Sequence, residues 1–171
     1  MTRDLLRTLF EAELDRTRPF LDAVPPDELA WAPAPRSYTL GRLAMHVATL
    51  PGWMPAYTTR DGHDMGAGGP GPATPSDVSA ITDAFVAASA RGRAALDACD
   101  DATLAQPWTL WRNGVVLARM TRAEAIATFA LQHLAHHRGQ LGVYLRLCGR
   151  PVPALYGDSA DAQLGPAPSA R

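Results

Sequence analysis

The amino-acid sequence predicts an all-α domain, a four-helix bundle with at most one short hairpin. Four stretches repeat apolar residues every three or four positions, which is the period of an amphipathic helix. These stretches are residues 2–23, 39–59, 76–99 and 121–148. The chain has 171 residues, enough for one domain with a real core. Four helices of this kind are typical of a bundle, in which each helix buries one apolar stripe.

The first two helices have clear boundaries in the sequence. The first ends before the pair Pro25-Pro26, because proline cannot continue a helix that needs its backbone N–H. Ser37 or Thr39 can cap the second helix, and Pro51 interrupts its later part. Apolar spacing continues beyond that proline, so we expect the helical conformation to reach about residue 59.

A long connection and a third helix follow. Residues 61–74 are rich in glycine and proline and have little to bury, which predicts a loop. The third helix, residues 76–99, presents apolar residues on one side. Residues 106–120 then break the helical period and contain Asn113-Gly114, a pair that favours a type I′ turn. We expect a short hairpin or an extended crossover there.

The last helix carries the strongest end signals in the chain. Thr121 followed by Glu124 is the capping-box pattern, in which each side chain satisfies a free backbone N–H. Gly149 after Cys148, with Pro151 two residues on, is a typical helix stop. The sequence therefore predicts one domain over residues 1–160 and a flexible tail over residues 161–171, with segment 152–161 packed on its surface.

Three histidines lie on the apolar faces of two predicted helices. His133 and His137 are one turn apart on the last helix, and His46 lies on the stripe of the second. Histidines at this spacing can aim ring nitrogens at one metal ion; core histidines with hydrogen-bond partners are the alternative. Three imidazoles suit a divalent ion such as zinc or nickel and leave a coordination position open, as in catalytic sites.

Other histidines and a neighbouring acid are weaker candidates for metal ligands. His63 and Asp64 lie in the predicted loop, where an exposed histidine is the more common outcome. His136 falls on the flank of the last helix, so we expect it near the solvent edge or behind the ligands. By helical position alone, the candidate pocket residues are Trp53, Tyr57 and Gln140.

Composition argues against several classes of partner. The net charge is −1 at pH 7, so nothing in the charge balance favours nucleic acid or acidic lipid. The sequence contains no apolar run of membrane-spanning length, and its first residues do not resemble a signal peptide. Cys99 and Cys148 form no CxxC motif, which favours reduced thiols in a cytoplasmic protein. Cys148 lies about 16 Å along the helix from His137, too far to share a metal.

Two stretches resemble the DinB-like superfamily of bacterial proteins. They are LGRLAMHVATLPGW around His46 and LQHLAHHRGQLGVYLRLCGRPVPALYGDSAD, which contains His133 and His137. The resemblance extends from the first helix to the tail. It implies a four-helix bundle with a long crossover connection, commonly a homodimer. It also implies one divalent metal held by three histidines, which correspond here to His46, His133 and His137.

The resemblance implies an activity less firmly than a site. Characterised relatives include thiol-S-transferases and a thiol-dependent maleylpyruvate isomerase. We therefore expect a metal-dependent enzyme that uses a low-molecular-weight thiol on a small electrophilic substrate. The alternatives are a metal-binding bundle without efficient catalysis and a metal-dependent hydrolase that uses metal-bound water. The sequence shows no obvious protein general base.

Overall fold

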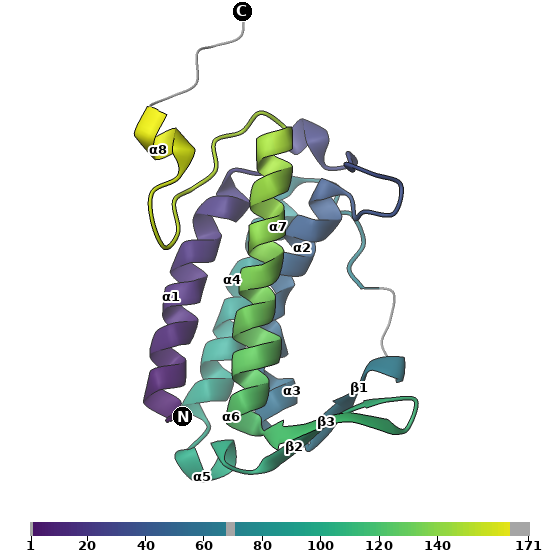
Figure 1. The fold of residues 1–171 in the computed structure, drawn as a ribbon, viewed down its shortest axis with the longest axis vertical. Helices are drawn as coiled ribbons and strands as arrows, with labels where there is room; N and C mark the ends of the chain where they lie inside the picture. Colours follow the sequence, from purple (N-terminus) through teal and green to yellow (C-terminus); the bar gives the residue numbers. More distant parts are fainter. Residues whose placement is uncertain (1, 68–70, 165–171) are drawn as a thin grey trace, which may run out of the picture.

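A computed structural model of the chain describes residues 2–67 and 71–164. Its main body is a bundle of helices that stand side by side (Figure 1). The four long elements are α1 (Arg3–Asp22), α2 (Leu40–Thr49), α4 (Val78–Asp97) and α7 (His133–Leu147). α1 contacts α2, α4 and α7, and α2 contacts α4 and α7, so the four elements enclose a common core.

Side-chain caps explain where the long helices begin. Thr2, Thr39 and Asp77 each precede a helix in extended conformation and accept a hydrogen bond from a backbone N–H in its first turn. Such caps satisfy N–H groups that have no partner inside the helix. The predicted helices at residues 2–23 and 76–99 are therefore present, each within two residues of its expected ends.

The second helical segment continues through its proline, as predicted. After α2 comes a 3₁₀ turn, η2 (Leu50–Trp53), and then a short helix, α3 (Met54–Thr58). Pro51 occupies the first turn of η2, where a backbone N–H has no partner within the helix, so that the missing N–H of proline costs little. This irregular helix carries His46, Trp53 and Tyr57 along one side of the bundle.

A long crossover joins α3 to α4. The hydroxyls of Thr39 and Thr74 lie 2.7 Å apart, which places the beginning of α4 beside the beginning of α2. The two helices therefore run in the same direction, and the connection returns along the length of the bundle (Figure 1). Within the described residues it contains a short strand, β1 (Gly62–Asp64), and a 3₁₀ turn, η3 (Met65–Ala67).

A three-stranded sheet closes one end of the bundle, so the prediction of an all-α bundle with at most one short hairpin is confirmed only in part. β2 (Pro107–Arg112) and β3 (Val115–Thr121) form the expected hairpin. Asn113 and Gly114 have φ angles of 51° and 79°, as a type I′ turn requires. The unexpected strand is β1, which pairs in parallel with β2.

Side-chain hydrogen bonds add to the backbone pairing that holds β1 in place. The carboxylate of Asp64 accepts hydrogen bonds from the backbone N–H groups of Gly66, Asn113 and Gly114. It thereby joins the crossover to the tip of the hairpin. A strand of three residues stabilised in this way has no period-2 apolar pattern, which explains why the sequence predicted a loop.

The last helix is continuous but irregular. Thr121 and Glu124 form the predicted capping box at the start of α6 (Arg122–Ala125). A π-helix, η4 (Ile126–Gln132), then leads into α7. π-Helices are rare, widen the helix locally and are frequent at functional sites. The smaller helical elements of the chain are η1 (Pro26–Glu28), α5 (Asp101–Leu104) and α8 (Ala160–Leu164).

An arginine without solvent exposure joins α1, α7 and the segment after α7. Arg138 forms an ion pair with Glu13 at 2.7 Å and donates hydrogen bonds to the hydroxyls of Thr17 and Tyr156. The hydroxyl of Tyr156 in turn donates to Glu13. Leu155 also packs against the core, so the expectation that segment 152–161 packs on the surface is confirmed.

The remaining sequence expectations are tested only in part. Of the predicted flexible tail, residues 161–164 belong to α8 (Ala160–Leu164), and residues 165–171 lie outside the described residues. The single domain over residues 1–160 stays a prediction. Both cysteines are free, as expected, and the cytoplasmic location stays a prediction as well.

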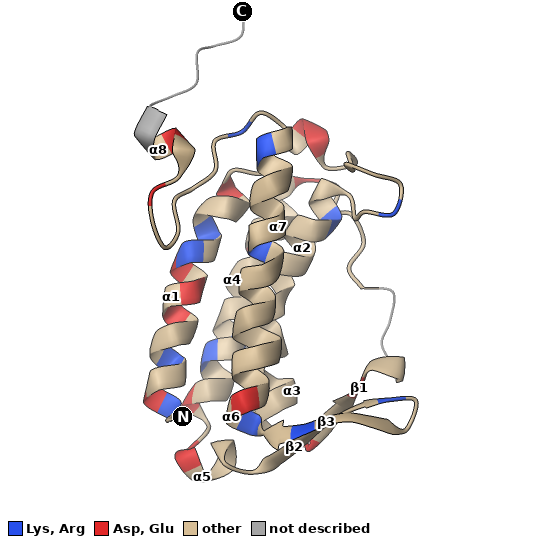
Figure 2. Ribbon diagram, in the orientation of Figure 1, with Lys and Arg blue, Asp and Glu red and all other residues tan. Residues whose placement is uncertain are grey.

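Acidic and basic residues are interleaved along α1 (Figure 2). None of the described helices combines the length and apolar character needed to cross a membrane.

Candidate metal centre

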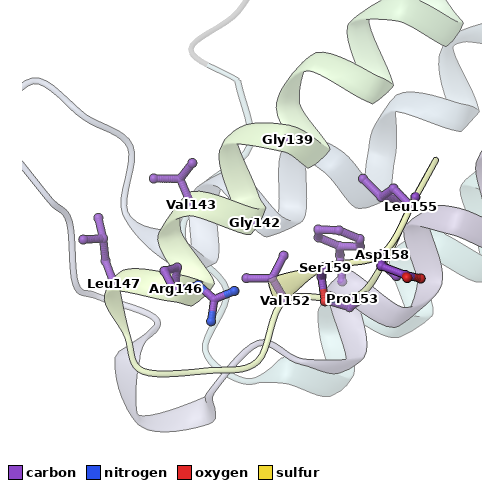
Figure 3. Close-up of a pocket in the computed structure, with 13 residues that line it drawn as sticks. Gly139, Gly142, Val143, Arg146, Leu147, Val152, Pro153, Leu155, Asp158 and Ser159 are labelled. Carbon is purple, nitrogen blue, oxygen red and sulfur yellow. The ribbon is translucent and has the colours of Figure 1, made fainter. Parts of the chain in front are cut away.

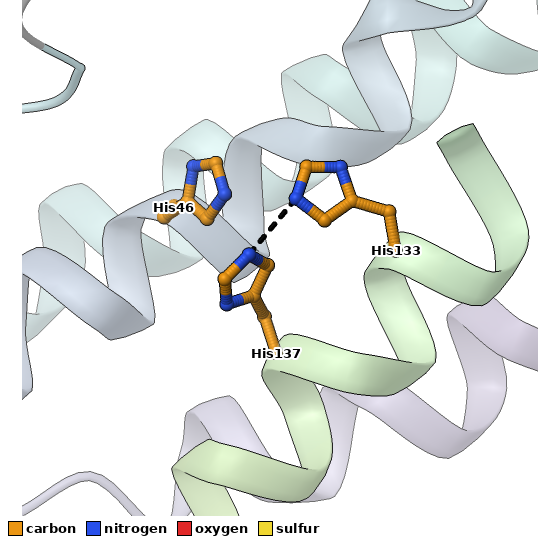
Figure 4. Close-up of side chains that lie close together, drawn as sticks. All are labelled: His46, His133 and His137. Carbon is orange, nitrogen blue, oxygen red and sulfur yellow. Dashed lines mark hydrogen bonds between the residues drawn. The ribbon is translucent and has the colours of Figure 1, made fainter. Parts of the chain in front are cut away.

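Three histidines from two helices converge between α2 and α7. His46 comes from the middle of α2, and His133 and His137 come from the first two turns of α7 (Figure 4). Each offers a ring nitrogen, and these nitrogens all lie within 4.8 Å of one another. The three residues predicted from the sequence are therefore brought together.

The two histidines of α7 face each other through the same ring atom. Nε2 of His133 lies 2.8 Å from Nε2 of His137 (Figure 4). The other nitrogen of His137, Nδ1, lies 2.7 Å from the side-chain oxygen of Gln140, an acceptor, so Nδ1 carries the proton.

The two facing Nε2 atoms lie at hydrogen-bond distance, and the tautomers of the two rings decide which one donates. With Nδ1–H of His137 directed at Gln140, Nε2 of His137 offers a lone pair toward His133. A cation between the rings could take the place of this hydrogen bond. The bond from His137 to Gln140 is of the kind by which proteins usually orient metal-binding histidines.

Burial keeps the three imidazoles neutral. Burial, together with nearby His137, His133 and Arg42, lowers the pKa of His46 to about 4. Burial also lowers the pKa of His133 and of His137, although the backbone of Phe129 and the side chain of Gln140 oppose this. All three pKa values therefore lie below the ordinary histidine value of about 6.5. Neutral imidazole is the form that binds metals.

The residues present fit a divalent ion. Among residues 2–67 and 71–164, Nδ1 of His46 is a buried ring nitrogen without a hydrogen-bond partner. Such a nitrogen is costly unless something satisfies it. In each of the three rings, one nitrogen lies close enough to the other two to share a metal ion.

Aromatic rings surround the cluster on one side and a pocket opens on another. The ring of Trp53 meets the rings of His46 and His133 edge to face, with centroids 5.7 and 5.8 Å away. A pocket of about 440 Å³ adjoins His137. Its lining consists of Ser37, Tyr38, Leu43, His137, Gln140, Val143 and Tyr144. A small molecule in this pocket would therefore lie next to the histidines.

A second pocket is unrelated to the histidine cluster. It has a volume of about 480 Å³ and lies between α7 and residues 152–159 (Figure 3). Its lining is largely apolar and includes Phe20, Val143 and Leu155 but none of the three histidines. The pocket beside His137 is therefore the one that can bring a ligand to the cluster.

The weaker candidates lie where the sequence predicted, or have other roles. His63 is exposed on β1 and lies outside the cluster, and Asp64 binds the hairpin tip instead. His136 is exposed, with its ring 4.9 Å from that of His137. Of the three candidate pocket residues, Gln140 lines the pocket and Trp53 contacts the histidines, whereas Tyr57 is buried away from both.

Sequence reasoning missed the π-helix that precedes His133. The carbonyl of Phe129 belongs to this π-helix and accepts a hydrogen bond from the hydroxyl of Tyr57. No residue type marks a carbonyl as an acceptor for a side chain, and the sequence has no signal for a π-helix. Only the arrangement of the helices shows this part of the site.

Comparison with known proteins agrees with the architecture. The chain is 29% identical over 162 residues to an uncharacterized protein, YrdA, of Bacillus subtilis, which covers 94% of this chain and 91% of the relative. Its fold is similar to the crystal structure of a DinB-like protein from Bacillus cereus, with a TM-score of 0.69, 24% identity and coverage of 91% and 98%. The crystal structure of a DinB-like protein, YjoA, from Bacillus subtilis gives a TM-score of 0.67 at 16% identity, with coverage of 88% and 96%.

A family description covers nearly all of the sequence. The DinB family matches residues 2–166, which include all three clustered histidines and both helices that carry them. The resemblance seen in two sequence stretches therefore extends to the whole domain, and this chain belongs to the DinB family.

Proposed function

We propose that this protein is a metal-dependent enzyme that uses a low-molecular-weight thiol to attack a small electrophilic substrate. His46, His133 and His137 would hold one divalent ion, with zinc and nickel the best matches to three imidazoles. The observation that carries the proposal is the cluster of three histidines from two helices, whose ring nitrogens all lie within 4.8 Å of one another.

The number of ligands favours a catalytic site over a structural one. Within the part of the chain that the structure describes, the cluster contains three histidines and no cysteine or carboxylate. A structural zinc site has four protein ligands, whereas a catalytic site has three and keeps a position for water or substrate. The pocket beside His137 gives a small molecule access to such a position.

The pocket lining favours an external thiol. A divalent ion supplies positive charge that lowers the pKa of a coordinating thiol, so that the thiolate forms near pH 7. Neither Cys99 nor Cys148 lines the pocket, so the thiol would come from a small molecule. Leu43 and Val143 offer apolar contact, and Tyr38, Gln140 and Tyr144 offer polar atoms that could orient the substrate.

Turnover assays with purified, zinc- or nickel-loaded protein test the proposal. We expect a model electrophile such as a chlorinated nitrobenzene to be consumed only when a low-molecular-weight thiol is also present. His137→Ala should remove this activity, and the exposed variant His63→Ala should retain it. Consumption without thiol would identify a hydrolase, and no turnover with any of several thiols would favour a metal-binding bundle without efficient catalysis.

We also propose that the protein is a homodimer, as the family resemblance implies. The outer edge of β3 has no partner in the described sheet, and Val115, Val116 and Leu117 on it are exposed. An exposed apolar edge strand commonly pairs with another chain. Light scattering at micromolar concentration should give twice the mass of one 18.3 kDa chain. A mass of one chain under these conditions would contradict the proposal.

A further inference from the structure

Gln140 lies between the histidine cluster and the adjacent pocket. It follows His137 by three residues on α7, so the two side chains are neighbours on the helix surface. Its side-chain oxygen lies 2.7 Å from Nδ1 of His137, and both residues line the pocket of about 440 Å³. Gln140 is also exposed. One side chain therefore touches a candidate metal ligand and borders the space in which a substrate would lie.

The hydrogen bond to His137 uses only the acceptor end of the Gln140 amide. The oxygen accepts from Nδ1–H, whereas the NH₂ group at the other end carries two donors that this bond does not use. A neutral ring that binds a metal through Nε2 must carry its proton on Nδ1. Metal binding by His137 would therefore keep the amide in this orientation, with its donors free to face a ligand.

The rest of the pocket limits what these donors can bind. The hydroxyl of Tyr144 donates to the backbone carbonyl of Tyr38 at 3.2 Å, so its proton is used within the protein. Leu43 and Val143 contribute apolar surface, and the ring of Tyr38 lies 6.4 Å from that of His46. A small apolar or aromatic molecule with one acceptor oxygen fits these surroundings, and a carbonyl group supplies such an oxygen.

Charge around the pocket also favours an electron-rich ligand atom. The described residues that line it include no aspartate or glutamate that would repel a carbonyl oxygen. The guanidinium carbon of Arg42 lies 4.3 Å from the centre of the Tyr38 ring, which brings positive charge to one wall of the pocket. An oxygen with partial negative charge is therefore the better match to the Gln140 amide.

We propose that Gln140 binds a carbonyl oxygen of the electrophilic substrate while it holds His137 in its Nδ1–H form. The inference rests on the proposed function and adds the class of electrophile, a small apolar molecule with a carbonyl group. Ligand binding and orientation of His137 then use opposite ends of one amide. A carboxylate at this position could serve only the second role, because it accepts hydrogen bonds and cannot donate them.

The experiment compares Gln140→Glu, Gln140→Ala and Gln132→Glu in the full-length protein, with acetophenone as the probe. We expect Gln140→Glu to bind acetophenone about 10-fold more weakly, the size of one lost hydrogen bond. Its zinc affinity should not fall, because carboxylates are usual partners of metal-binding histidines. Gln140→Ala should lose both roles, with zinc binding about 10-fold weaker.

Gln132→Glu is the matched control. Gln132 is the last residue of η4, is exposed and lines neither of the two pockets, so the variant adds the same charge away from the site. It should bind acetophenone and zinc like the unmodified chain. Chelator competition measures zinc affinity in all variants.

Proton–nitrogen NMR of the metal-free protein measures acetophenone binding, so that the carbonyl cannot bind to zinc instead. The side-chain amide signals of Gln140 are identified by their loss in Gln140→Glu. They should shift when acetophenone is added to the unmodified chain. Ethylbenzene, which has a similar shape but no oxygen, should leave them unchanged.

Equal acetophenone affinity in Gln140→Glu and the unmodified chain, or no shift of the Gln140 signals, would overturn the inference. Unchanged zinc affinity in Gln140→Ala would do the same. Glutamate and alanine are good helix formers, so the variants should fold; if one does not, the signals of the unmodified chain decide. Absence of zinc binding in the unmodified chain would refute the proposed metal site, while the acetophenone comparison would still test ligand binding by Gln140.

Discussion

Replacing His137 with alanine is expected to weaken zinc binding by more than about 100-fold, because it removes a ligand and not merely a group that orients one. His46→Ala and His133→Ala should have effects of the same size, since the three ring nitrogens share one space. Elemental analysis after purification, and zinc affinity by chelator competition, measure the loss. Circular dichroism shows whether each variant is folded.

Two histidines of the same chain serve as matched controls. His136 is next to His137 in the sequence but exposed, and His63 lies on β1. We expect His136→Ala and His63→Ala to keep full metal content. Full occupancy in folded His137→Ala, or loss of metal only in His63→Ala, would show that the three clustered histidines are not the ligands.

Replacing Arg138 with alanine is expected to reduce the free energy of unfolding by about 3–5 kcal/mol, the usual cost of removing one member of a buried ion pair. The side chain of Arg138 is 0% exposed and that of its partner Glu13 is 12% exposed. The variant leaves the Glu13 carboxylate with little solvent to replace the guanidinium. It also removes the donor to Tyr156, which joins the segment after α7 to the bundle. Urea denaturation of the metal-free protein measures the change.

Arg146→Ala is the control on the same helix. Arg146 pairs with Asp161, but its side chain is 48% exposed. Ion pairs of this kind contribute about 0–1 kcal/mol, so the midpoint of unfolding should move little. Equal decreases in the free energy of unfolding for Arg138→Ala and Arg146→Ala would mean that the buried ion pair stabilises the fold no more than the exposed one.

The sequence by itself determined the helices and the identity of the clustered histidines. Caps such as Thr2, Thr39 and the Thr121–Glu124 box act within one turn of the helix, so they can be recognised from a few neighbouring residues in the sequence. The histidines were found for a related reason: an apolar stripe must face the core, so polar residues on two stripes are brought inward together. Only the helical period and the expectation of a bundle were therefore needed to identify His46, His133 and His137 as a cluster.

The tertiary structure alone decided the third strand, the buried arginine and the contact between Tyr57 and the π-helix. β1 pairs with β2, and Asp64 binds backbone groups at the tip of the same distant hairpin. Arg138 is buried because Glu13, on another helix, compensates its charge. The Phe129 carbonyl of the π-helix binds the hydroxyl of Tyr57, 72 residues away in the chain. Each feature depends on partners distant in sequence, and a periodic pattern contains no information about such pairs.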